Sequence, residues 1–142
     1  MRTTALDVAE YILSKKKPMT AMKLQKLVYY CQAWSLVWEE RPMYENRIEA
    51  WANGPVVVDL YSAHRGQYML ESVSGDSSRL SMSDVETIDA VLEYYGERSS
   101  QWLSDLTHQE KPWLKARGSL PRGWRGSEEI TLASMAEYYG SL

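Results

Sequence analysis

The chain has 142 residues and a formal net charge of −3, so we expect a single domain over residues 1–142 and no binding to nucleic acid by the molecule as a whole. Apolar residues make up 44% of the chain, which is enough to build a hydrophobic core. Because the sequence shows neither an apolar leader nor an apolar run long enough to cross a membrane, we expect a cytoplasmic protein without membrane contact.

The aromatic residues and the charges are unevenly chosen. The chain has 10 Tyr and 6 Trp but no Phe, so its aromatic side chains all carry a polar tip and suit both core edges and interfaces. Residues 1–47 hold eight Lys and Arg against five Asp and Glu, and the remainder holds eight against fourteen. A weakly basic segment therefore precedes an acidic one.

Two helices are predicted at the start of the chain. Thr4 can cap the first, which ends before Pro18. Thr20 can cap a second, longer helix that reaches about Glu40 and carries a stripe at helical spacing, made of Leu24, Leu27, Val28, Cys31, Ser35 and Trp38. Cys31, on this stripe, is predicted to be a buried and inert thiol and not a nucleophile.

A short hairpin and a third helix are predicted next. Residues 43–51 alternate loosely between apolar and polar, which indicates two short strands around Glu45. Pro55 is suited to the first position of a helix, and Gly54 before it is a tolerated N-cap. These preferences predict a helix from Pro55 to about His64.

Three further helices are predicted in the second half of the chain. Ser83 and Glu86 have the spacing of a capping box, and the helix that they begin would end at Gly96. A shorter helix over residues 100–108 would bury Trp102, Leu103 and Leu106. With a last helix capped by Thr131, the sequence predicts an all-α domain of about six helices with room for one small β-hairpin.

No catalytic or metal-binding motif is evident. Two His and one Cys cannot fill a four-ligand zinc site without carboxylates, and the usual His and Cys spacings are missing. The glycines are isolated, so there is no phosphate-binding loop, and there is no Gly-x-Ser-x-Gly. We therefore expect no cofactor, no metal and no enzymatic activity.

Two segments carry side chains suited to a partner. His64 and Arg65 end the predicted third helix, where the alternative role is capping by a positive charge. Residues 111–125, predicted to be irregular, combine basic and Trp side chains without an acid and could contact bases or an acidic protein; the alternative is a solvated loop whose tryptophans pack on the core. The candidate partner-binding residues are Tyr61, His64, Arg65, Trp113, Arg117 and Trp124.

Several blocks resemble, in order and spacing, the Panacea-domain family of SocA-like or GepA-like antitoxins, over about residues 4–140. The blocks are "MTAMKLQKLVYYCQAW" (19–34), "IEAWANGPVV" (48–57), "LTHQEKPWLKAR" (106–117) and "EEITLASMAEYY" (128–139). One position departs from the pattern, because Asn53 stands where the family commonly has an aromatic residue. We interpret Trp51, Gly54 and Pro55 of the second block as structural.

The resemblance implies an antitoxin that binds and neutralises the protein product of a neighbouring toxin gene. The toxins of the family are varied and include enzymes similar to small alarmone synthetases, and the family is frequent in bacteria and on prophages. One branch of the family acts as an adaptor that delivers the toxin to an ATP-dependent protease. The resemblance brings no catalytic residues.

Four functions remain as alternatives. Direct toxin binding and protease delivery cannot be separated by the sequence. A nucleic-acid-binding repressor that uses residues 111–125 is disfavoured by the net charge and by the lack of a helix-turn-helix signature. An enzyme has the least support, and we expect direct binding of a toxin.

Overall fold

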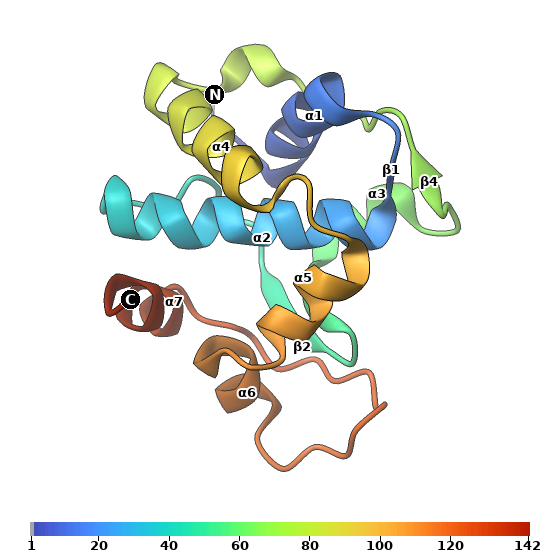
Figure 1. Cartoon of the computed structure of the whole chain (residues 1–142), viewed down its shortest axis with the longest axis vertical. Coiled ribbons are helices and arrows are strands. Elements are labelled where there is room, and N and C mark those ends of the chain that lie inside the picture. The colour runs from blue at the N-terminus through green and yellow to red at the C-terminus, as the bar shows by residue number, and fades with distance from the viewer. Residues whose placement is uncertain (1) are drawn as a thin grey trace.

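Helix α2 (Ala21–Trp38) forms the centre of the fold in the computed structural model, which describes residues 2–142 (Figure 1). Buried residues occur on all sides of this helix, as expected for a helix covered by others. On one side lie α1 (Ala5–Lys16) and α4 (Met82–Tyr95); on the other lie a β-hairpin, α5 (Ser100–Thr107), α6 (Lys111–Arg117) and α7 (Leu132–Gly140). Residues 2–142 contain seven α-helices and only short strands, so the predicted fold class is confirmed.

The predicted N-caps of three helices are present. Thr4 and Asp7 form a capping box at the start of α1. The Thr20 hydroxyl accepts a hydrogen bond from the amide of Lys23, and Thr131 plays the same part at the start of α7. These caps depend only on residues within one turn, which is why the sequence predicts them.

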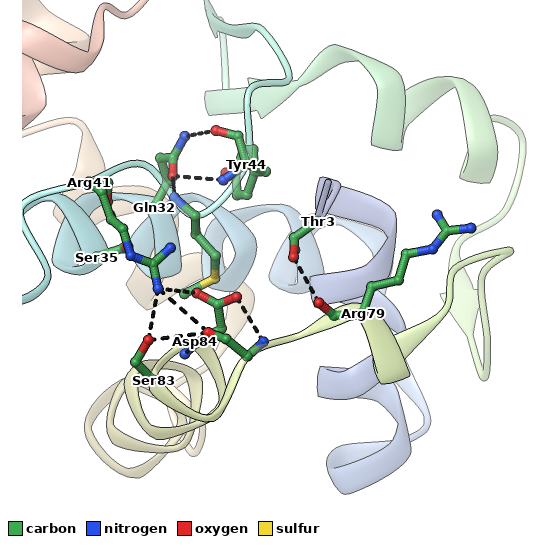
Figure 2. A network of polar contacts seen from close by, with 10 residues as sticks. Thr3, Gln32, Ser35, Arg41, Tyr44, Arg79, Ser83 and Asp84 are labelled. Carbon is green, nitrogen blue, oxygen red and sulfur yellow. Dashed lines mark hydrogen bonds and ion pairs between the residues drawn. The ribbon is translucent and has the colours of Figure 1, made fainter. Parts of the chain in front are cut away.

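The cap of α4 differs from the prediction. Ser81 and Asp84 form the capping box, with both hydrogen bonds at 3.1 Å, so the predicted box of Ser83 and Glu86 is wrong. Figure 2 shows the reason: Arg41, from the loop after α2, donates to the Ser83 hydroxyl at 2.7 Å and pairs with the Asp84 carboxylate at 3.3 Å. A contact between distant segments thus selects the helix start.

The hairpin lies further along the chain than predicted. Strands β2 (Ile48–Trp51) and β3 (Gly54–Val57) pair antiparallel around Ala52 and Asn53, so the turn predicted at Glu45 is wrong. Pro55 lies inside β3, and the helix predicted to start there begins three residues later as α3 (Val58–His64).

Pairing with a third segment explains the position of Pro55. Pro55 faces Ala50 across the hairpin, and the Ala50 amide bonds instead to the carbonyl of Glu128 at 2.9 Å. Pro55 and Ala50 therefore form a non-hydrogen-bonded pair of the hairpin. A proline is tolerated there, because its missing N–H would not have bonded to β2. Residues 128–130 run beside β2 and hold it in place, because the Ile130 amide bonds to the Ile48 carbonyl.

Other local departures concern short elements. Residues 111–125, predicted to be irregular, are helical over α6, and the loop comes only after Arg117. Strands β1 (Met19–Thr20) and β4 (Met69–Leu70) form a second small pair, and a 3-10 turn, η1 (Ser77–Arg79), lies between β4 and α4. Trp102, predicted to be buried, is 36% exposed.

Tyrosines supply the aromatic part of the core, since the chain has no Phe. Tyr29, Tyr30 and Tyr139 are buried side by side, and the hydroxyls of Tyr30 and Tyr139 each donate to one Glu110 oxygen at 2.7 Å. The Tyr29 hydroxyl bonds to that of Tyr139 at 3.0 Å. Each of these buried hydroxyls therefore has a hydrogen-bond partner, as buried polar groups ordinarily do. Burial raises the pKa of Glu110.

Candidate partner-binding site

A cleft of about 400 Å³ opens between the N-terminal half of α2, the β2–β3 turn and α3. We call it the α2 cleft. Its apolar walls include Met22, Trp51, Val56 and Tyr61. Its polar lining includes Gln25, Lys26, His64 and Arg125, and no acidic residue lines it.

An aromatic and cationic cluster forms one wall of the α2 cleft. Trp51 and Tyr61 pack edge to face with ring centroids 4.8 Å apart. The Arg125 guanidinium lies 3.8 Å from the centre of the Trp51 ring and 5.6 Å from that of Tyr61, within reach of a cation–π interaction. Trp, Tyr and Arg are the residues that dominate binding energy at protein interfaces.

Gln25 and His64 form a buried pair below this wall. The Gln25 amide exchanges two hydrogen bonds with the backbone of Val57, at 2.8 and 3.2 Å, and its nitrogen lies 3.0 Å from His64 Nε2. Because the Gln25 nitrogen is the donor, His64 Nε2 accepts, which requires a neutral ring. Burial lowers the pKa of His64 and favours the same state. His64, predicted to bind a partner or to cap the helix end, is only 5% exposed.

Lys26 forms part of the floor of the α2 cleft and is 1% exposed. Within residues 2–142 its amine has no hydrogen bond and no ion pair, and it is not one of the fully enclosed polar atoms, so it faces the cleft. Burial lowers its pKa to about 8. Gly54 makes room for it: a Cβ at Gly54 would lie 2.5 Å from Lys26 Cε and 2.9 Å from the Thr107 hydroxyl. Sequence reasoning missed Lys26 and Gln25, because polar residues on a helix are ordinarily assigned to its solvent face.

The loop after α6, residues 118–126, is held against the hairpin by Arg117, and Trp113 ties α6 itself to the hairpin. Arg117 is 7% exposed, and its guanidinium donates to the carbonyls of Ala50, Pro121, Trp124 and Arg125 at 2.7 to 3.1 Å. Trp113 donates to the Trp51 carbonyl at 2.8 Å and stacks on His108. Trp124 is 64% exposed.

The predicted partner residues therefore differ in position. Tyr61 and His64 line the α2 cleft, Arg65 is exposed directly after α3, and Trp124 is exposed on the loop that carries Arg125. Trp113 and Arg117 contact the backbone behind the cleft. Of the residues interpreted as structural, Gly54 and Pro55 are buried, whereas the partly buried Trp51 also lines the cleft.

The family of the chain is shown by the match of a family model. The model of the Antitoxin SocA-like, Panacea domain, matches residues 24–114, which is more than half of the chain. The chain belongs to this antitoxin family. The resemblance seen in the sequence blocks is thereby confirmed. Curated proteins and solved structures gave no match.

Most of the α2 cleft lies within the matched part of this Panacea domain. Lys26, Trp51 and His64 fall inside residues 24–114. Arg125 belongs to the loop that follows, and closes one side of the cleft by its contact with Trp51. The floor thus comes from the matched domain, and one cation of the rim comes from outside it.

A second groove, of about 560 Å³, lies at the other end of α2, against α4 and α7. Trp34 and Trp38 stack there with centroids 5.1 Å apart, and Tyr94 borders them. Trp38, predicted to lie on the apolar stripe of its helix, is 49% exposed, and Tyr94 is 63% exposed. We call this surface the Trp38 groove.

Residues 2–142 contain no metal-binding cluster, no membrane-spanning helix and no reactive thiol. No group of three or more His, Cys, Asp or Glu in this range is arranged to hold a metal ion. None of the helices in the same range combines the length and the apolar character that a membrane span needs. Cys31 is fully buried, and burial raises the pKa of its thiol, which makes it unreactive.

Proposed function

We propose that this chain is a cytoplasmic, non-enzymatic antitoxin that neutralises a cognate protein toxin by binding it directly. Its family supports the antitoxin role. The observation that carries the binding surface is the cluster of Trp51, Tyr61 and Arg125 at the rim of the α2 cleft. Arg65 and Trp124 are both exposed, and each is next in sequence to a residue that lines the cleft, so they extend this surface.

The charge of this surface indicates the kind of partner. Lys26, Arg125 and Arg65 are cationic, and none of the residues that line the α2 cleft is acidic. An acidic patch on the toxin would be attracted to such a surface and would bind it in one orientation.

Coexpression with the product of the adjacent gene tests this proposal. We expect the wild-type chain to restore growth and to copurify with the toxin. Arg65→Glu and Trp124→Ala should weaken the complex at least tenfold with little change in melting temperature, because both side chains are exposed. Met82→Ala is the control, since Met82 is 80% exposed and begins α4, away from the α2 cleft. Neutralisation without a complex, or equal binding by all variants, would refute the proposal.

A protease adaptor is the second candidate, because an adaptor needs two separate surfaces. The α2 cleft and the Trp38 groove lie at the two ends of α2 and meet that requirement. Toxin that disappears in the wild-type strain, but persists when the protease is deleted or when Trp38 is replaced by Glu, would support the adaptor over sequestration.

A nucleic-acid-binding repressor has less support. The basic segment 111–125 was its only sequence argument. Arg117 of this segment is buried, and its guanidinium donates to backbone carbonyls. One of the five basic side chains of the segment is therefore not available to nucleic acid.

A further inference from the structure

We infer that the α2 cleft is a binding site for a carboxylate carried on an apolar or aromatic group, with the Lys26 ammonium as the partner of the carboxylate. The inference does not rest on the proposed function, because it concerns the isolated chain. It begins from the one charged side chain in the floor of the cleft that has no partner within residues 2–142.

The unpartnered amine of Lys26 is costly for the fold. A largely buried ammonium without a counter-ion loses most of its hydration, and no side chain of residues 2–142 replaces it. A methionine of similar length would fill the same space without this cost. Gly54 is also needed to leave room for the lysine stem. A bound anion would offset the desolvation cost of the Lys26 ammonium, which would explain why a lysine occupies this buried position.

The other polar groups of the floor restrict the charge of the ligand. The Gln25 amide is already bonded to Val57 and to His64, so it has no further donor directed into the cleft. Lys26 is thus the only cation of the floor, and Arg125 lies at the rim, stacked on Trp51. One ammonium matches a single carboxylate, whereas a phosphate is ordinarily bound by several donors.

The walls determine the rest of the ligand. Trp51, Tyr61, Val56 and Met22 offer mainly apolar surface. A volume of about 400 Å³ is within the range of small-ligand pockets and is much larger than a carboxylate. The remainder of the ligand must therefore be apolar, and an aromatic ring would pack against the Trp51 and Tyr61 rings.

Two sources carry this chemistry: a free aromatic acid, and the C-terminal residue of a protein chain. Phenylacetate and its neutral analogue phenylacetamide test the first by titration calorimetry. The tripeptide Gly-Gly-Phe, with a free or an amidated C-terminus, tests the second. Binding of only one of the two acids identifies the source and supports the shared chemistry.

Variants connect the binding to Lys26. Lys26→Met removes the charge, and Lys23→Met is the matched control, because Lys23 lies on the same helix but does not line the cleft. We expect saturable millimolar or tighter binding of an acid to wild type and Lys23→Met, and at least tenfold weaker binding to Lys26→Met and of the amide to wild type. If Lys26→Met fails to fold, Lys26→Gln and the acid–amide comparison on wild type provide the test. Equal binding of acid and amide, equal binding by Lys26→Met, or no saturable binding of either acid would overturn the inference.

Discussion

Replacing Gly54 by alanine tests the packing that places Lys26 in the α2 cleft. Gly54 has φ +122, a conformation that is strained for an alanine by about 1–3 kcal/mol. The added Cβ would also lie 2.5 Å from Lys26 Cε and 2.9 Å from the Thr107 hydroxyl. Forcing these atoms apart costs about 1–3 kcal/mol more. The sum, about 2–6 kcal/mol, is a large part of the stability of a domain of this size.

Gly66→Ala is the matched control. Gly66 also has a positive φ, +86, but an added Cβ would meet nothing within 4 Å. Its cost is therefore the backbone strain alone, about 1–3 kcal/mol. The difference in free energy of unfolding between the two variants, measured by urea denaturation, isolates the contact with Lys26 and Thr107.

A double variant identifies the colliding side chain. Lys26→Ala removes Cε, so Gly54→Ala should cost about 1–2 kcal/mol less in that background than in wild type. If Gly54→Ala and Gly66→Ala are equally destabilised, or if the double variant shows no coupling, Gly54 does not hold the space for Lys26 and the reasoning is wrong.

Three other predictions follow from the site. Burial places the pKa of Lys26 at about 8, below the value of about 10.4 in the unfolded chain. Between pH 8 and about pH 10.4 the unfolded chain therefore binds a proton that the folded chain has released. Wild type should gain stability relative to Lys26→Met as the pH rises through this window. His108 is a titratable neighbour of Lys26, but its pKa is lowered, so its ring stays neutral throughout this pH window. Urea denaturation at pH 7.5 and at pH 9.5 measures the difference in free energy of unfolding between wild type and Lys26→Met. A difference that is the same at both pH values contradicts the lowered pKa of Lys26. Arg117→Ala should free the loop after α6 and raise its proteolysis rate at least tenfold; unchanged cleavage would show that its carbonyl contacts do not hold the loop. Trp113→Ala should lower stability by about 2–4 kcal/mol, whereas exposed Trp124→Ala should change it by less than about 0.5 kcal/mol, and similar melting temperatures for the two would refute their separation into internal and surface roles.

Most helices of this chain follow from local sequence. Thr4, Thr20 and Thr131 cap the helices that the apolar spacing predicts, since a cap and its first turn need only neighbouring residues. The family resemblance was also available from the sequence, and it is confirmed over residues 24–114. Local sequence was not sufficient where a residue distant in the chain binds the predicted cap. Arg41 donates a hydrogen bond to the Ser83 hydroxyl, and the N-cap of α4 is Ser81 instead of Ser83.

Tertiary structure decided the hairpin and the α2 cleft. Residues 54–57 form strand β3, which is buried and paired with β2. The free energy gained by this burial and pairing exceeds the local preference of Pro55 for the first position of a helix. The same packing buries Lys26, because the hairpin and α5 cover the face of α2 on which it lies. Sequence alone therefore determined most of the helices and the family, but not α6 or the starts of α3 and α4. Which polar side chains of α2 lie inside depended on segments that are distant in the chain and meet only on folding.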